Sequence, residues 1–236
     1  CNRCSFVCPH AVIRPYLLDA DEVEKAPEGF VSVPAKGAKE YAFSLQISDM
    51  DCTGCGSCVA SCPLSGKALR MERVTQELTL TPAWEYGLTI SEKNAFQPTT
   101  VKGSQFRQPL CEFSGACAGC GETPYAKLLT QLYGDRMYWA NATGCSQAWG
   151  APMPGIPYTT NFRGFGPAWT NSLFENNAEL TLGMFLSVRQ QREAQKTRVE
   201  ALAASDVSAE VRTAAEKWLE AYEDFDASRI ASDELI

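Results

Sequence analysis

The feature that most constrains this chain is a run of four cysteines at residues 52–62, spaced C-x2-C-x2-C-x3-C and followed directly by a proline. Cysteines three residues apart can hold three corners of an iron–sulfur cube, whereas tetrahedral zinc is better served by two well-separated C-x2-C pairs. The spacing therefore predicts an iron–sulfur cluster rather than zinc or structural disulfides. Such ligands must be reduced thiolates, which indicates a reducing, cytosolic compartment.

A second, shorter run opens the chain, where CNRCSFVCPH carries three cysteines before its proline. Laid over the full run, these are its last three members, and the first would lie three residues before Cys1. We therefore expect the chain to be a piece of a longer protein. In bacterial two-cluster sequences of this kind, the cysteine before the proline ligates the other cluster. The expected ligand sets are Cys52, Cys55, Cys58 and Cys8 for one cluster, and Cys1, Cys4 and Cys62 for the other.

Composition excludes several other classes of protein. The chain has 236 residues, of which 45% are apolar, so it can bury a normal core without disulfide support. Its net charge of −7 comes with no basic patch, which argues against nucleic-acid binding. No apolar run approaches the roughly 18–20 residues that a membrane-spanning helix needs, so we expect no membrane partner.

The first region, residues 1–103, holds both cysteine runs and repeats itself. CPHAVIR after the first run echoes CPLSGKALRM after the second, which predicts a duplicated unit in which Pro9 and Pro63 each begin a helix. Residues 43–48 alternate apolar and polar side chains as a half-buried strand does, and residues 78–80 do so more weakly. The 43 residues between Cys8 and Cys52 are more than a minimal cluster module needs, so a surface insertion is expected between the runs.

The middle of the chain changes character. Residues 92–109 are polar, rich in turn residues and without period, and are predicted to form a linker. Residues 122–133 predict a helix that ends at a glycine, and residues 137–142 predict a short buried strand leading into the loop TGCS at 143–146. Residues 147–170, with their prolines and glycines, are expected to be irregular. The apolar face expected of the helix consists of Ala126, Leu129 and Tyr133.

From about Asn171 the chain is predicted to be helical, with residues 209–225 forming a further helix rich in alanine and charge pairs. The acidic excess of this last region is interpreted as a solvated face.

The remaining cysteines and the single histidine carry weaker signals. Cys117 and Cys120 form a C-x2-C pair, which fits redox dithiols, zinc sites and clusters alike. Cys145 lies in the loop after the predicted strand and makes a three-cysteine site geometrically feasible. Cys111 fits no spacing and is interpreted as an apolar core residue. His10 is interpreted as a capping or surface residue, because no positioned carboxylate accompanies it.

Three longer motifs point to a family. EFSGACAGCGETPYAKLLTQLYGDRM at 112–137, NATGCS at 141–146 and GPAWTNSLFENNAE at 166–179 closely resemble pyruvate:ferredoxin (flavodoxin) oxidoreductase. The resemblance implies an α+β architecture: a two-cluster ferredoxin-like domain at 1–103 and, at 104–236, the N-terminal part of an α/β thiamine-diphosphate-binding domain with long helices. It covers essentially the whole chain.

The resemblance also implies site residues. Cys117, Cys120 and Cys145 match three ligands of a third, proximal [4Fe–4S] cluster, whose fourth ligand in the family comes from farther downstream. The family's Gly-Asp-Gly motif, which holds Mg²⁺ and the pyrophosphate of thiamine diphosphate, has no counterpart here. The residues that the resemblance places beside the thiamine cofactor are Thr143, Gly144 and Ser146 in the loop and Phe174 on the next helix.

The implied reaction is the oxidative decarboxylation of pyruvate with coenzyme A to acetyl-CoA and CO2, with electrons passed through the clusters to ferredoxin or flavodoxin. The remainder of the same polypeptide and a second copy of it, forming a homodimer, are the expected partners. Two alternatives stand beside this reading. One is a free-standing two-cluster electron carrier with a helical appendage, and the other is a sister oxidoreductase acting on a different 2-oxoacid.

Overall fold

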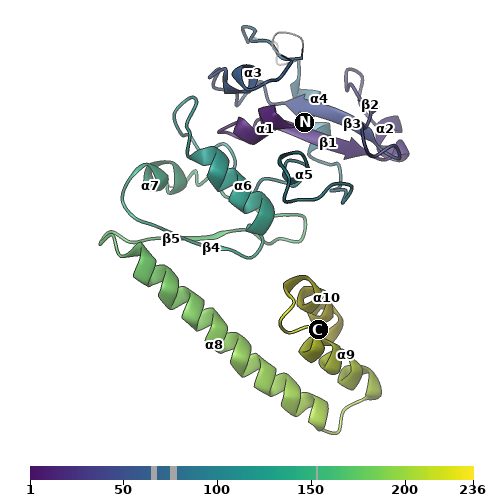
Figure 1. The fold of residues 1–236 in the computed structure, drawn as a ribbon, viewed down its shortest axis with the longest axis vertical. Coiled ribbons are helices and arrows are strands. Elements are labelled where there is room, and N and C mark those ends of the chain that lie inside the picture. The colour runs from purple at the N-terminus through teal and green to yellow at the C-terminus, as the bar shows by residue number, and fades with distance from the viewer. Residues whose placement is uncertain (65–67, 75–78, 153) are drawn as a thin grey trace. The chain divides into compact units, whose positions relative to one another are not determined.

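The chain folds into two compact units, residues Cys1–Asn177 and Ala178–Ile236 (Figure 1). The computed structural model describes residues 1–64, 68–74, 79–152 and 154–236. Within these ranges, no helix combines the length and apolar character needed to cross a membrane.

The first unit opens on a three-stranded antiparallel sheet. Strands β1 (Ile13–Leu18) and β3 (Ala42–Ile47) pair along their whole length, and β2 (Val33–Pro34) pairs with the other edge of β3. The alternating pattern at 43–48 thus correctly predicted β3 to within one residue. The strand expected at 78–80 is wrong where it is described, because Thr79 and Leu80 form a turn, and Leu78 lies outside the described residues.

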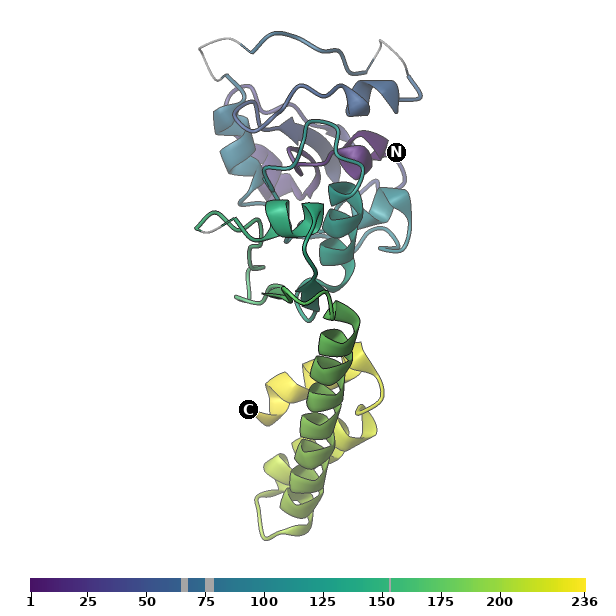
Figure 2. The same cartoon turned by 90° about the vertical axis from the view of Figure 1, so that its left-hand side faces the viewer.

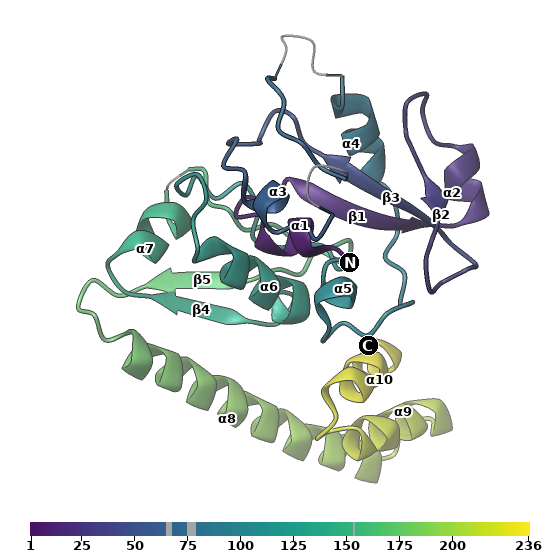
Figure 3. The ribbon, with the colours of Figure 1, turned by 45° about the horizontal axis from the view of Figure 1, so that its top comes forward.

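Five short helices accompany this sheet: α1 (Arg3–Val7), α2 (Ala20–Glu24), α3 (Ser57–Ala60), α4 (Thr81–Gly87) and α5 (Val101–Ser104). Helices α1 and α3 lie side by side (Figure 3). Each is preceded by a residue in the left-handed region, Asn2 with φ 57° and Gly56 with φ 77°. The two cysteine runs therefore share one local geometry, as the sequence repeat predicted.

The expectation that Pro9 and Pro63 begin helices is wrong. Both prolines lie in turns after their helices, and the residues 65–67 that follow Pro63 fall outside the described part of the chain. The physical reason is visible at Cys8, which is extended with φ −70° and ψ 117°. A proline disfavours helical geometry in the residue before it, so Cys8-Pro9 ends α1 instead of starting a helix.

The rest of the first unit carries a helix and a small parallel sheet. Helix α6 (Thr123–Tyr133) is followed by β4 (Tyr138–Asn141), α7 (Cys145–Gly150) and β5 (Ala168–Asn171), and β4 pairs with β5 in parallel. The helix at 122–133 was correctly predicted. The strand at 137–142 forms, but it is not buried as expected, because Tyr138 is 55% exposed and only Asn141 is buried. The stretch 147–170 is irregular only in its middle, because it begins within α7 and ends within β5.

The buried face of α6 differs from the expected one. Leu129 and Tyr133 are 44% and 50% exposed, whereas Lys127 and Thr130 are each only 2% exposed. This face meets backbone carbonyls and polar side chains, which need hydrogen-bond donors rather than apolar groups. Only Ala126 of the expected apolar set is buried, at 3% exposure.

The linker expected at 92–109 is also wrong at its C-terminal end. Helix α5 forms within it, and Gln105 is 3% exposed. The Asn2 side-chain amide donates to the Lys102 carbonyl at 2.9 Å, and Ser5 Oγ donates to Gln105 Oε1 at 2.9 Å. This segment packs on α1, so the first compact unit continues through it to Asn177.

The second unit is helical. Helix α8 (Asn177–Ala204) leads to α9 (Ala209–Glu220) and α10 (Phe225–Leu235), and Figure 2 shows α9 and α10 beside the C-terminal half of α8. The chain is not helical from Asn171 as expected, because Asn171 ends β5 and α8 begins only at Asn177. The helix expected at 209–225 ends at Glu220, and α10 was not predicted. Asp224 begins α10 by accepting a hydrogen bond from the Ala227 N–H at 2.9 Å. The core of this unit consists of Trp218, Tyr222 and Ala231, with Val199, Leu219, Ala221 and Leu235 packed against them.

Candidate iron–sulfur sites

Four cysteines from both runs line one pocket. Cys58 lies in α3, Cys52 and Cys55 lie in the loop before it, and Cys8 comes from the other run, directly after α1. The buried Cys8 packs with Val12 and Ile13, and Cys58 packs against the same cluster. The structure thus brings together the set of four that the crossing rule selects.

The second expected set consists of Cys1, Cys4 and Cys62. Burial raises the pKa of the Cys4 thiol, and the nearby Cys58 and Cys62 sulfurs raise it further, so Cys4 and Cys62 are neighbours. Cys1 is exposed at the start of the chain, whereas Cys4 and Cys62 are half-buried. Cys4 packs against the cluster formed by Cys8, Val12 and Ile13, which places the two cysteine sets next to each other.

The loop around the pocket depends on glycine. Gly54 and Gly56 have φ values of 69° and 77°, and nothing lies within 4 Å of a Cβ atom built on either residue. They are therefore needed for backbone conformation rather than for space, since the left-handed region is costly for residues with a Cβ. Asn2, which precedes α1, takes the same conformation with φ 57°, which asparagine tolerates better than most residues.

The chemistry of the donor set is that of a cluster site. In the part of the chain that the structure describes, no group of three or more histidine, cysteine or carboxylate side chains is close enough to hold a single metal ion. A four-iron cube is larger than an ion and separates its thiolates accordingly. Four cysteines around an open pocket, three of them at three-residue spacing, fit such a cube.

The Cys117–Cys120 loop lies against this pocket. A Cβ atom built on Gly119 would lie 3.6 Å from Cys55 Cβ and 3.8 Å from Ser57 Oγ. Ser57 Oγ is itself 3.5 Å from Cys55 Sγ. Burial opposes ionisation of Cys55, but hydrogen bonds from Ser57 and from the backbone N–H of Gly119 outweigh it and lower the pKa of this thiol. The loop between Cys117 and Cys120 thus contacts a cysteine of the full run through Gly119.

His10 is not the surface residue that the sequence analysis expected. It is 4% exposed, lines the same pocket as the four cysteines, and its Nε2 atom is buried without a hydrogen-bond partner. Its backbone carbonyl accepts from the Phe113 N–H at 3.1 Å. Burial lowers the pKa of His10. Its position directly after Cys8-Pro9, which folds back onto the pocket, explains the burial.

Cys145 is exposed and begins α7, directly after strand β4. One turn later, Trp149 Nε1 donates to Glu122 Oε2 at 3.0 Å, and Glu122 follows Cys120 by two residues. Helix α7 is therefore tied to the start of α6. Within the described ranges, Cys117, Cys120 and Cys145 do not form a group close enough to hold a single metal ion.

The residues expected beside the thiamine cofactor cluster at the carboxyl edge of the parallel strands. Thr143 Oγ1 donates to Glu175 Oε1 at 2.9 Å, which joins the ends of β4 and β5. Gly144 precedes α7, and the Ser146 carbonyl accepts from the Asn141 amide at 2.9 Å. Phe174 is 89% exposed and lies in the turn before α8, not on the helix as expected.

Cys111 is the buried core residue that its isolated position predicted. It is 3% exposed and packs with Ala126 and Trp149. Burial raises the pKa of its thiol to about 12. Cys111 does not line the pocket of the four cysteines.

Comparison with known proteins agrees with this arrangement. Residues 1–66 match the 4Fe-4S dicluster domain family. The whole chain is 56% identical to pyruvate-flavodoxin oxidoreductase of Klebsiella pneumoniae and 51% identical to pyruvate:ferredoxin oxidoreductase of Moorella thermoacetica, covering 20% of each. Over its whole length, the chain is thus similar to a segment of pyruvate:ferredoxin (flavodoxin) oxidoreductases. It spans about a fifth of the length of these relatives.

The oxidoreductase family extends to proteins with another electron acceptor in their name. Over 82% of its length the chain is 55% identical to pyruvate dehydrogenase [NADP(+)] of Cryptosporidium parvum, of which it covers 10%. The three relatives share pyruvate in their names and differ in flavodoxin, ferredoxin or NADP(+). A similar segment therefore occurs in proteins whose names share pyruvate and differ in the electron acceptor.

Proposed function

We propose that this chain is the electron-transfer segment of an enzyme that oxidatively decarboxylates pyruvate with coenzyme A to acetyl-CoA and CO2. In this proposal, residues 1–103 are a ferredoxin-like domain with two [4Fe–4S] clusters, and residues 104–236 open a thiamine-diphosphate-binding domain. Electrons leave to ferredoxin or flavodoxin. The observation that carries the proposal is the contact of the Cys117–Cys120 loop, through Gly119, with Cys55 at the four-cysteine pocket.

The cluster ligands follow from this arrangement. One cluster is held in the four-cysteine pocket, a second lies at Cys4 and its neighbours, and a third, proximal cluster is completed by a cysteine from elsewhere in the polypeptide. The proposed ligands are Cys8, Cys52, Cys55 and Cys58 for the first, Cys1, Cys4 and Cys62 for the second, and Cys117, Cys120 and Cys145 for the third.

The chain's own contribution is to position these clusters. Electron tunnelling falls steeply with distance, so a loop flanked by two ligands of one cluster and touching a ligand of the next favours transfer between them. Hydrogen bonds to cluster thiolates set the potentials, and Ser57 and Gly119 are placed to donate them to Cys55.

This chain supplies only part of the proposed thiamine site. Thiamine diphosphate with Mg²⁺, when bound, supplies the carbanion chemistry of decarboxylation. The carboxyl edge of parallel strands is where α/β folds bind ligands, and Thr143, Gly144, Ser146 and Phe174 lie at this edge. Because Gly-Asp-Gly does not occur in this sequence, the pyrophosphate is proposed to be held by another part of the polypeptide. A cytoplasmic homodimer is the proposed assembly.

The proposal is tested on the complete polypeptide, purified anaerobically. Pyruvate and coenzyme A together should drive reduction of ferredoxin or flavodoxin, and electron paramagnetic resonance should resolve three cluster signals after chemical reduction. Other 2-oxoacids, tested in parallel, should react more slowly. Cluster signals without any 2-oxoacid-dependent reduction would support a free-standing electron carrier instead, and faster turnover of another 2-oxoacid would support a sister enzyme.

A further inference from the structure

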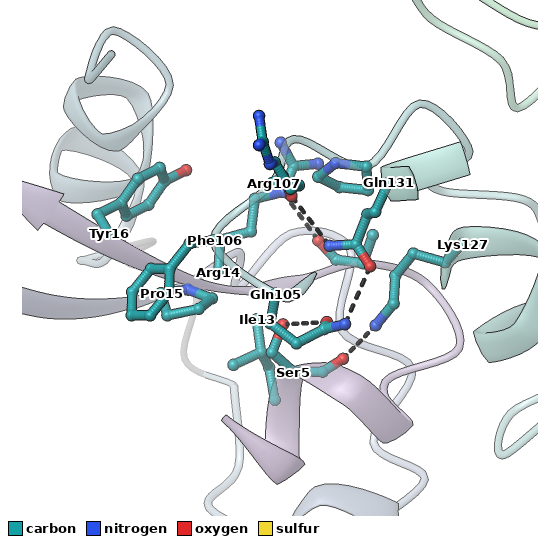
Figure 4. A pocket seen from close by; sticks show the side chains of 12 residues that line it. Ser5, Ile13, Arg14, Pro15, Tyr16, Gln105, Phe106, Arg107, Lys127 and Gln131 are labelled. Atoms are coloured by element: carbon teal, nitrogen blue, oxygen red, sulfur yellow. Dashed lines mark hydrogen bonds between the residues drawn. The ribbon is translucent and has the colours of Figure 1, made fainter. Parts of the chain in front are cut away.

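A lysine on α6 is buried beside both ferredoxin-type cluster sites. Lys127 is 2% exposed. Its Nζ atom donates to the backbone carbonyls of Ser5, Phe6 and Cys8, the last two at 3.3 and 3.2 Å. Figure 4 shows the Lys127 side chain reaching from α6 to Ser5. Lysine is almost never fully buried without a specific partner, so this placement calls for a role.

The contacts select the charged form of this side chain. An ammonium group has three N–H donors and no acceptor, and Lys127 meets three carbonyl oxygens. These carbonyls belong to the C-terminal end of α1, where a cation is favoured. The Ser5 carbonyl also accepts from the Cys8 N–H at 3.2 Å. Lys127 is therefore a buried positive charge that holds the helix carrying Cys4.

A polar layer fixes the surroundings of Lys127. Gln105 Nε2 donates to Gln131 Oε1 at 3.0 Å, and Gln131 Nε2 donates to the Arg107 carbonyl at 2.9 Å, both drawn in Figure 4. Ser5 joins this layer through its bond to Gln105. No carboxylate lines the pocket beside Lys127. One of the residues whose carbonyl Lys127 contacts is Cys8, which lines the four-cysteine pocket.

We propose that Lys127 is a fixed positive charge that favours the reduced state of both ferredoxin-type clusters, most strongly the one ligated by Cys8. This inference rests on the cluster assignment of the proposed function. When a cluster accepts one electron from its donor it gains one negative charge, and no bond or proton need change. In a low-dielectric interior a nearby cation stabilises that added charge, which raises the reduction potential.

The experiment uses the complete polypeptide in four forms: wild type, Lys127→Met, Lys127→Gln and Lys127→Arg. Anaerobic redox titrations followed by electron paramagnetic resonance give the potential of each cluster. At a fixed potential, Lys127→Met and Lys127→Gln should lower the ratio of reduced to oxidised Cys8-ligated cluster at least tenfold, which corresponds to about 59 mV for one electron. Lys127→Arg keeps the positive charge and should restore the wild-type ratio.

Two comparisons separate charge from packing. Lys127→Gln keeps two N–H donors for the α1 carbonyls but removes the charge, so it should match Lys127→Met in potential while unfolding at a higher temperature. Lys39→Met removes an exposed positive charge from the same unit and should leave both potentials unchanged, because solvent screens it.

The outcomes are distinct. Equal potentials in Lys127→Gln, Lys127→Arg and wild type, with cluster signals at full intensity, overturn the inference and leave Lys127 a structural cap of α1. If Lys127→Met fails to fold, the comparison of the glutamine and arginine variants still decides. Absence of ferredoxin-type cluster signals from the wild type would contradict the proposed function itself. The potentials of the variants test only the role of Lys127, so the two failures can be told apart.

Discussion

Gly119 packs against Cys55: a Cβ atom built on the glycine would lie 3.6 Å from the Cβ atom of the cysteine. This contact joins the loop between Cys117 and Cys120 to the full cysteine run, although the two stretches are separate motifs in the sequence. In the proposed function, this contact links two cluster sites for electron transfer. The predictions below test this contact and the interactions that hold the first unit together.

Replacing Gly119 by alanine should cost about 1 kcal/mol of stability, because its φ of 77° lies in the left-handed region. The distance to Cys55 is an ordinary van der Waals contact, so the cost is conformational. Relaxation of the strained loop should also move its N–H away from Cys55 and lower the potential of that cluster. Urea denaturation and redox titration measure the two effects.

Gly115→Ala is the matched control for Gly119→Ala. Gly115 has a φ of 67°, and a Cβ atom built on it meets nothing within 4 Å. The control should lose a similar amount of stability while leaving the cluster potential unchanged. Equal shifts of potential in both variants would show that the contact with Cys55 does not tune the cluster.

Cys145→Ala should remove the signal of the proximal cluster and stop pyruvate-dependent electron transfer while leaving the other two clusters intact, because Cys145 is a proposed ligand of that cluster alone. Electron paramagnetic resonance and turnover with pyruvate measure this. Cys111→Ala is the control: the buried thiol packs with Ala126 and Trp149, so its loss should cost about 1 kcal/mol through a small cavity and no cluster signal. Three surviving signals in Cys145→Ala would exclude it as a ligand.

Arg14→Met should destabilise the first unit by roughly 3 kcal/mol. The guanidinium pairs with Glu112, and the two side chains are only 9% and 20% exposed, so the variant leaves a carboxylate buried without its partner. Arg14 also lies 4.8 Å from the centre of the Trp84 ring. Arg70→Met breaks a pair whose side chains are 80% and 64% exposed and should cost well under 1 kcal/mol.

A double-mutant cycle isolates the Arg14–Glu112 interaction. Adding Glu112→Gln to Arg14→Met should recover part of the lost stability, because the unpaired charge disappears. Additive losses in the double variant, measured by denaturant unfolding, would show that the two side chains do not interact energetically.

Glu22 should contribute stability that depends on pH. Burial opposes its ionisation, but hydrogen bonds from the Asp19 and Ser91 N–H groups and from Lys93 lower the pKa of this carboxyl below 4.5. A lowered folded-state pKa means that the stabilisation is present above the unfolded-state pKa and is lost as pH falls through the folded one. The wild type should therefore exceed Glu22→Gln in unfolding free energy near neutral pH, and the difference should shrink below pH 4.5. A difference that stays constant into acid pH would contradict this.

Local sequence patterns were enough for the elements whose residues interact with near neighbours. The alternation at 43–48 predicted β3, the helical period at 122–133 predicted α6, and the apolar run at 137–142 predicted β4. The spacing of the two cysteine runs selected the four residues that line one pocket. These signals are readable because helix and strand periods, and the three-residue spacing of cluster ligands, are properties of adjacent residues.

Contacts between distant segments decided the rest. The residues around Lys127 in the sequence do not indicate that it is buried. Its burial comes from the packing of α6 against the carbonyls at the end of α1. The sequence around Gln105 is that of a polar linker, but in the structure its side chain accepts a hydrogen bond from Ser5, a hundred residues earlier. His10 is buried because Cys8-Pro9 turns the chain onto the pocket. The burial and electrostatic environment of a side chain depend on which segments pack against it. Contacts between segments far apart in the chain produce no periodic pattern in the sequence, so the sequence alone did not predict them.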